Sequence, residues 1–219
     1  MGIADGGTAV TAAGDSSMIH RRFVGIAGGV SPVLASALDS VGPPEFPDRG
    51  GVTPGHFLAR VVVGQQLSTR AARSIWSRVE RAAEDAGVPI PELFTDDRHD
   101  TLRACGLSRN KVRTLGHIRA AHESGDLVGE RLRALDHQAL SELLLPLWGV
   151  GQWTCDMAAL FYCGCPDVWP EQDVTVQKTF AQLIGRRRKP ARAAERFAPH
   201  RSWLALYMWR LADATPVQD

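Results

Sequence analysis

Asp173 is the side chain of this sequence that is best placed to do chemistry. A run of residues at helical spacing follows it: Val174, Gln177, Phe180 and Leu183. Asp173 therefore stands where a helix is expected to begin, and a carboxylate there stabilises the helix by about 1 kcal/mol as an N-cap. The same carboxylate can point into a cleft, where it can stabilise a developing positive charge or take a proton from water. Capping and catalysis are compatible roles, and both remain open at this residue.

A glycine turn, Gly149-Val150-Gly151, precedes Asp173 in the chain. An apolar helix is expected to end near Leu147, and a second apolar stripe follows the turn: Trp153, Met157, Leu160 and Phe161. The two glycines permit backbone angles that other residues avoid, and Val150 can anchor the turn inward. This pattern predicts a helix-hairpin-helix over residues 138–163, whose exposed N–H groups suit a phosphate oxygen. An ordinary helical hairpin with a glycine turn fits the same residues.

The elements that must position these residues are predicted to be helices. Alternating runs of β-branched residues are few, and helical periodicity continues almost throughout from residue 55 onward. Helices are expected over residues 32–41, 98–105, 108–123, 136–147, 151–163, 173–184, 191–198 and 200–212, and another begins at an N-cap at Ser68. Residues 1–17, rich in Gly, Ala, Ser and Thr, are predicted to form a disordered tail. The predicted fold class is all-α.

The composition is that of a globular protein. Of the 219 residues, 44% are hydrophobic, which allows a sizeable core and excludes wholesale disorder. The 25 Lys and Arg nearly balance the 24 Asp and Glu, so only local clusters of charge can indicate nucleic acid. No apolar run is long enough to span a membrane and no secretory signal is recognisable, so a cytoplasmic protein is expected. The cysteines at 105, 155, 163 and 165 lack the spacing of a zinc site, and buried thiols are expected.

Several segments, taken in order, resemble the helix-hairpin-helix DNA glycosylase superfamily. They are residues 64–68 (Gly-Gln-Gln-Leu-Ser), 105–113 (Cys-Gly-Leu-Ser-Arg-Asn-Lys-Val-Arg), 147–154 (Leu-Trp-Gly-Val-Gly-Gln-Trp-Thr), 166–170 (Pro-Asp-Val-Trp-Pro), 173–178 (Asp-Val-Thr-Val-Gln-Lys) and 201–210. Within that superfamily the sequence is most similar to the 3-methyladenine DNA glycosylase II group, over roughly residues 32–212. The resemblance implies a single glycosylase unit over residues 18–219, with two helical lobes and a central DNA-binding cleft. One lobe would hold residues 18–60 and 175–219, and the other residues 61–174.

The resemblance also implies which residues act on the damaged base. Asp173 matches the essential carboxylate of the superfamily, and Trp209 matches the position whose ring stacks on the base. Trp153 and Trp169 are secondary candidates for the pocket, although most tryptophans in a helical protein belong to the core. Asp156 and Glu171 are fallback candidates for catalysis, with a structural or surface role as the simpler interpretation.

Further residues are implied to contact DNA. The wedge that fills the gap left by a flipped base is expected in one turn: Gln66 as the first choice, with Gln65 and Leu67. The phosphate-binding hairpin would use Gly149, Val150, Gly151 and Thr154. Ser108, Arg109 and Lys111, at the start of a helix, are expected to make other DNA contacts. By resemblance, the main-chain carbonyls of Leu145, Leu147 and Val150 would hold a sodium or potassium ion.

One position distinguishes the reaction type. Members of the superfamily that also nick the strand resemble one another in a Lys nucleophile two residues beyond the glycine turn, where this chain has Trp153. The four-cysteine cluster of iron–sulfur members is also absent, so no cofactor is expected. The sequence therefore predicts a monomeric, monofunctional hydrolase of alkylated purines such as 3-methyladenine in double-stranded DNA. Two alternatives remain: a non-catalytic DNA-binding module, and a glycosylase for deaminated or mismatched bases.

Overall fold

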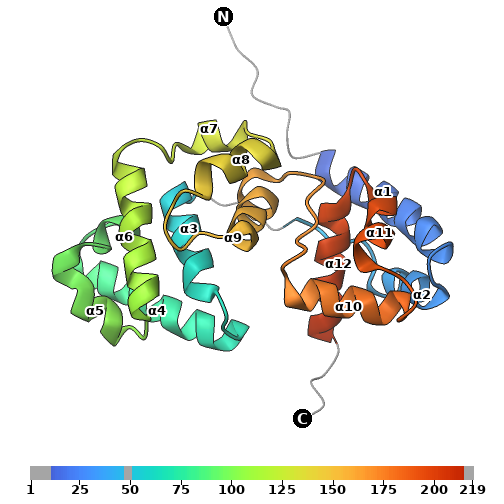
Figure 1. Cartoon of the computed structure of the whole chain (residues 1–219), viewed down its shortest axis with the longest axis horizontal. Helices are drawn as coiled ribbons and strands as arrows, with labels where there is room; N and C mark the ends of the chain where they lie inside the picture. Colours follow the sequence, from blue (N-terminus) through green and yellow to red (C-terminus); the bar gives the residue numbers. More distant parts are fainter. Residues whose placement is uncertain (1–10, 47–50, 215–219) are drawn as a thin grey trace, which may run out of the picture. The chain divides into compact units, whose positions relative to one another are not determined.

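A computed structural model describes residues 11–46 and 51–214, which contain twelve α-helices and no strand (Figure 1). The predicted all-α class is confirmed over these residues. The predicted tail lies partly outside them, but its residues 11–17 belong to helix α1 (Thr11–Gly28), so the prediction is wrong for that part. Ile19, Phe23 and Ala27 of α1 are buried on one face, and a helix nucleated by this packing extends back into a Gly/Ala/Ser-rich sequence. None of the described helices is long and apolar enough to cross a membrane.

The chain divides into two compact units. The terminal unit holds residues 1–47 and 166–219, and the middle unit holds residues 48–165. The boundaries expected from the sequence fell instead after residues 60 and 174. Helix α3 (Pro54–Gly64) belongs entirely to the middle unit because it packs against the helices of that unit. The segment 166–174 belongs to the terminal unit because it is hydrogen bonded to the start of helix α12 (Arg201–Ala214).

The terminal unit packs its helices around one apolar core. Besides α1 and α12 it contains α2 (Pro32–Val41), α10 (Val174–Ile184), α11 (Pro190–Ala194) and the short 3₁₀ segment η4 (Glu195–Phe197). Phe23, Phe180 and Phe197 are fully buried, and Phe197 makes edge-to-face contacts with both other rings. Helix α12 packs directly on α10, so the core fixes the start of α10, where Asp173 lies, against the side chains of α12.

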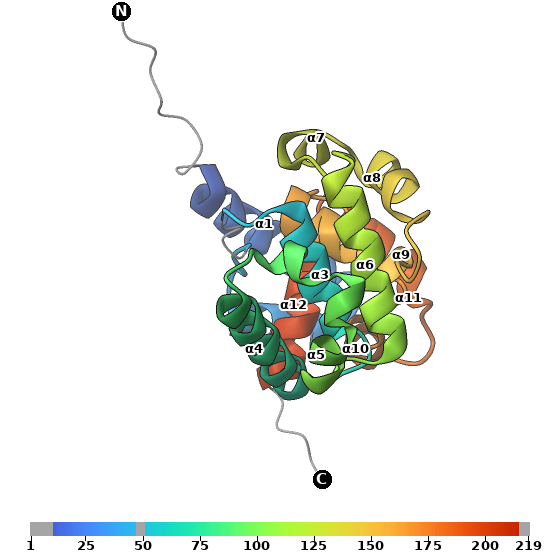
Figure 2. The same cartoon turned by 90° about the vertical axis from the view of Figure 1, so that its left-hand side faces the viewer.

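The middle unit is built around α3 and α6 (Arg109–Glu123), which run side by side (Figures 1 and 2). Its other elements are α4 (Thr69–Ala86), η1 (Ile90–Leu93), η2 (Asp96–Arg98), α5 (His99–Ala104), α7 (Gly129–Arg133), α8 (His137–Leu144), α9 (Gln152–Met157) and the π-helical segment η3 (Ala158–Cys163). Ser68 caps α4 through its side chain, as predicted, and Ser108 caps α6 in the same way. The predicted helix-hairpin-helix is present as α8, a turn, and α9 continuing into η3.

Candidate active site and DNA-binding surface

Asp173 is the N-cap of α10 in the terminal unit. Its Oδ1 accepts hydrogen bonds from the Val176 backbone N–H (2.9 Å) and from the Trp209 indole Nε1–H (3.3 Å). The side chain is 8% exposed, so the carboxylate is held in one place and largely shielded from water. The structure thus brings together the two residues that the sequence analysis gave to the carboxylate and to the base platform, from elements 36 positions apart in the chain.

The segment that leads to Asp173 is fastened to the start of α12. Asp167 accepts from the Arg201 guanidinium at both oxygens, with distances of 2.7 and 2.8 Å, and Oδ1 also accepts from the Arg201 backbone N–H. Val168 N–H donates to the Ser202 hydroxyl at 2.9 Å. The Arg201 guanidinium beside Asp167 holds the pKa of that carboxyl below its usual value. Sequence reasoning missed this pair because neither residue carries a local signal of its partner.

The three tryptophans predicted for the base pocket occupy different environments. Trp209 is partly buried beside Asp173, as described above. Trp169 is only 7% exposed and makes an edge contact with Phe180, so the structure places its ring in the core of the terminal unit. Trp153 lies in the first turn of α9 in the middle unit and is partly exposed. Trp209 therefore has a direct hydrogen bond to the candidate catalytic carboxylate.

The hairpin turn depends on a single glycine. Gly149 has φ of 80°, and a Cβ added there would lie 2.0 Å from Thr114 Oγ1 of α6. Gly151 has φ of −111°, and an added Cβ would meet nothing within 4 Å. The expectation that both glycines supply unusual backbone angles is therefore wrong for Gly151. Val150 is 7% exposed and anchors the turn inward, as predicted.

The two predicted fallback carboxylates have other environments. Asp156 in α9 is 3% exposed, and its Oδ1 is 2.8 Å from His137 Nε2 of α8 and 2.9 Å from Gln152 Nε2. This partly buried network ties the two helices of the hairpin together. Glu171 is exposed. Asp156 is thus part of the hairpin structure, and sequence reasoning missed its partner His137.

The residues predicted to form the wedge lie in a tight turn between α3 and α4. Gln65 has φ −51° and ψ 131°, Gln66 has φ 56°, and Leu67 N–H donates to the Gly64 carbonyl at 3.3 Å. These values are typical of a type II turn, whose third residue is usually glycine because it needs a positive φ. Gln66 and Leu67 are exposed.

Gln65 instead points toward the hairpin. Its Nε2 donates to Thr154 Oγ1 at 3.0 Å and lies 3.5 Å from the Gly149 carbonyl. Thr154 is 1% exposed, so its side chain supports this contact from inside and does not face solvent. Gln66 and Leu67 are therefore the wedge candidates that the structure leaves available.

The predicted DNA contacts at the start of α6 also separate into two kinds. Ser108 and Arg109 are exposed. The Lys111 ammonium donates to the Val63 carbonyl at 2.7 Å and to the Gln65 carbonyl at 2.9 Å. The structure therefore places Lys111 on the end of α3, where unsatisfied carbonyls and the helix dipole attract a cation.

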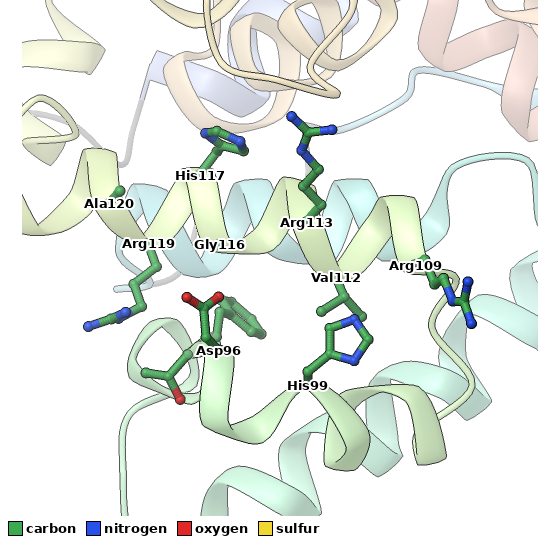
Figure 3. A pocket seen from close by; sticks show the side chains of 11 residues that line it. Asp96, His99, Arg109, Val112, Arg113, Gly116, His117, Arg119 and Ala120 are labelled. Atoms are coloured by element: carbon green, nitrogen blue, oxygen red, sulfur yellow. The ribbon is translucent and has the colours of Figure 1, made fainter.

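A positively charged groove of about 510 Å³ runs along α6 in the middle unit (Figure 3). Its ionisable lining residues are Arg109, Arg113, Arg119, His99, His117 and Asp96. The Arg113 guanidinium lies 4.2 Å from the centre of the ring of Trp148, the residue that precedes Gly149 in the chain. His117 stacks on the same ring. Two residues of the groove therefore contact Trp148 beside the hairpin turn, and the groove is lined by three arginines and one carboxylate.

Among the described residues, no group of three or more His, Cys, Asp and Glu side chains is arranged to hold a metal ion. Cys105, Cys155 and Cys163 are buried. Burial raises the pKa of the Cys155 thiol to about 11, so this thiol stays protonated at neutral pH.

Comparison with known proteins connects this geometry to a family. No family model matches the chain. DNA-3-methyladenine glycosylase 1 of Schizosaccharomyces pombe is 32% identical over 171 residues, which are 74% of this chain and 75% of that protein. The solved structure of a 3-methyladenine DNA glycosylase of the same organism, in complex with abasic DNA, has a TM-score of 0.76 and 28% identity, covering 86% of this chain and 95% of that one.

A second solved structure agrees with the first. A DNA-3-methyladenine glycosidase of Bacillus halodurans has a TM-score of 0.70 and 27% identity, and the match covers 89% of each chain. The sequence relative covers more than two thirds of both chains, and both structural neighbours share nearly the whole fold. The chain belongs to the DNA-3-methyladenine glycosylase family of helix-hairpin-helix proteins.

Proposed function

We propose that the protein is a monofunctional DNA glycosylase. It binds double-stranded DNA, flips an alkylated purine such as 3-methyladenine out of the stack, and hydrolyses the N-glycosidic bond to leave an abasic site. The observation that carries this proposal is Asp173, a shielded carboxylate fixed by the Val176 and Trp209 N–H groups. A protein that only binds anionic DNA has no need of a carboxylate in this position.

In the proposed reaction the C1′–N bond breaks, and its electron pair leaves with the base. An alkylated purine is cationic and becomes neutral as it leaves, so no partnering general acid is required. Positive charge develops at C1′, as in glycoside hydrolysis generally, and the Asp173 carboxylate stabilises it. The water oxygen then bonds to C1′, and its proton passes to Asp173 and on to solvent.

Trp209 has two tasks in this proposal. Its N–H holds one carboxylate oxygen of Asp173, and its ring offers a surface for the cationic base. Such a cation–π contact is worth about 0.5–2 kcal/mol. Trp153 stands where a strand-nicking member would have its lysine, and an indole cannot form a Schiff base. The reaction therefore stops at the abasic site.

The DNA backbone is proposed to lie on the hairpin and on the α6 groove. The second helix of the hairpin begins at Gln152, and the N–H groups and dipole at a helix start suit a phosphate oxygen. Arg109 and Arg113 add positive charge beside them. The carbonyls of Leu145, Leu147 and Val150 would hold a sodium or potassium ion at the turn. Oxygen donors suit such ions, although the Leu147 carbonyl already accepts from the Val150 N–H.

The protein is further expected to act as a monomer in the cytoplasm. Sedimentation of the protein with and without a methylated duplex tests the monomer directly. A dimer would have twice the mass of one chain, and it would add twice that protein mass to each bound duplex.

The function itself is tested by base release from methylated duplex DNA, with the strands analysed before and after alkali treatment. We expect free methylpurines and abasic sites that break only after alkali. Binding to damaged DNA without release from a broad panel of lesions would indicate a binding module, and release of hypoxanthine or mismatched bases alone would indicate a different glycosylase.

A further inference from the structure

We infer that Lys111 is a positioning residue that fixes the exposed Gln66–Leu67 tip for insertion into DNA, and that it does not contact a DNA phosphate. The inference rests on the proposed function, because it concerns the step in which a base leaves the duplex. The tip is named here as Gln66 and Leu67, the two exposed residues of the turn after α3.

Lys111 binds two backbone oxygens at the start of the turn. Its ammonium donates to the carbonyls of Val63 and Gln65, at 2.7 and 2.9 Å. These carbonyls lie at the C-terminal end of α3, where no further helical turn supplies donors. Lys111 comes from α6, so it joins the start of the turn to a different helix.

Gln65, whose carbonyl accepts from Lys111, is also held by its side chain. Gln65 donates from its side chain to the Thr154 hydroxyl at 3.0 Å, and Thr154 is buried in α9. Gln65 is therefore held by α6 through its backbone oxygen and by the hairpin helix through its side chain. The residue before the tip cannot rotate without breaking at least one of these bonds.

The backbone of the tip is strained at Gln66. Gln66 has φ of 56°, a value that non-glycine residues rarely adopt. Such a conformation persists only where the surrounding structure fixes it, and Lys111 and Thr154 supply that restraint through Gln65. Leu67 is 38% exposed, so the restraint presents an apolar and an amide side chain to solvent together.

The neighbours of Lys111 on α6 behave differently. Arg109 and Arg113 are exposed and line the groove on this helix, where Figure 3 shows the two side chains extending from α6. Lys111 is partly buried, and this burial lowers the pKa of its ammonium. The charge of Lys111 is thus engaged inside the protein, whereas Arg109 is exposed to solvent.

The salt dependence of DNA binding separates a positioning role from a phosphate contact. The logarithm of the DNA-binding constant falls linearly with the logarithm of the salt concentration, and each lost phosphate contact reduces the magnitude of this slope by about 0.9. We expect Lys111→Met to leave this slope unchanged on an unmodified duplex, and Arg109→Gln, its matched loss of one charge on the same helix, to reduce it by about 0.9. A drop of about 0.9 for Lys111→Met would overturn the inference.

Excision rates test the effect on the wedge. The substrates are a methylated base in a normal pair and the same base opposite an abasic site, where flipping costs less. We expect Lys111→Met to reduce single-turnover release about tenfold on the paired substrate and less than about threefold on the unpaired one, because only the paired substrate needs the tip to hold the gap open. An equal loss on both substrates would contradict a positioning role.

A second variant covers the case in which Lys111→Met does not fold. Gln65→Met removes the tether to Thr154 and keeps the backbone carbonyl. It should lower single-turnover release on the paired substrate more than on the unpaired one, in the same ratio as Lys111→Met. Lys111→Arg, which keeps a donor at the carbonyls, should recover part of the loss on the paired substrate. Wild-type protein that releases no base from either substrate refutes the proposed function, whereas active wild type with unchanged ratios in the variants refutes only this inference.

Discussion

At the scale of single residues, the proposed catalysis depends on how the Asp173 carboxylate is held. The carboxylate is an N-cap and also accepts from the Trp209 indole, so the helix and the aromatic platform fix it together. The sequence was sufficient to predict Asp173 as a cap and catalyst, because an acidic residue before a helical stripe is a local pattern. It was not sufficient to predict the Trp209 bond or the Asp167–Arg201 pair, since these depend on side chains that meet only in the folded core.

We predict that Trp209→Phe slows base release about tenfold. A hydrogen bond to a charged group contributes about 1.5–3 kcal/mol, and at 3.3 Å this one belongs at the weaker end. Trp203→Phe on the same helix is the control, because its indole nitrogen is buried without a hydrogen-bond partner among the described residues. In single-turnover kinetics, Trp203→Phe should release the base at nearly the wild-type rate. An unchanged rate for Trp209→Phe would show that the Trp209 N–H does not contribute to base release.

We predict that Asp167→Asn lowers the free energy of unfolding by about 1 kcal/mol at pH 7, because the paired groups are partly exposed. The native pKa of Asp167 is lowered, so its stabilisation is fully present above the unfolded value of about 3.9. It is lost as pH falls through the lower native pKa. Urea denaturation of both proteins from pH 7 to pH 2 should show the two stabilities converge below about pH 4; a constant difference would exclude the ion pair as its cause.

At the scale of elements, α6 supports both surfaces that are proposed to contact DNA. Lys111 binds the end of α3, Thr114 fits against Gly149, and Arg113 lies over Trp148. Most helix positions could be predicted, because their apolar spacing and caps are local signals; α2, for instance, has the predicted bounds. Helices α7 and α1 were not predicted, because α7 has only five residues and α1 begins in a sequence of small polar residues.

We predict that Gly149→Ala destabilises the middle unit by at least about 2 kcal/mol, whereas Gly151→Ala changes it by less than about 0.5 kcal/mol. The first substitution places a Cβ against Thr114 at a positive φ, and the second meets open space at an ordinary φ. Thermal or urea unfolding of both variants is the measurement. Thr114→Ala should recover part of the Gly149→Ala loss, and purely additive effects would show that the close contact is not the cause.

At the scale of the whole molecule, the net charge is near zero, although one groove on α6 is locally basic. With 25 basic and 24 acidic residues, the chain has no global field to attract DNA, and the cations that are proposed to contact DNA lie along α6. The ordered motifs were enough to predict the family and the all-α fold. The division into units was not predictable in detail, because segments 48–60 and 166–174 are assigned by their packing and hydrogen bonds, which the sequence does not display.

The most direct test of the central claim is single-turnover base release from methylated duplex DNA by wild type and Asp173→Asn. Asn caps helices as well as Asp, so the variant should keep its fold and its affinity for DNA. Because an amide cannot accept the water proton or stabilise positive charge at C1′, we predict that release falls by at least about a hundredfold. Release by Asp173→Asn within a few-fold of wild type, with DNA binding intact, would contradict the assignment of Asp173 as the catalytic carboxylate.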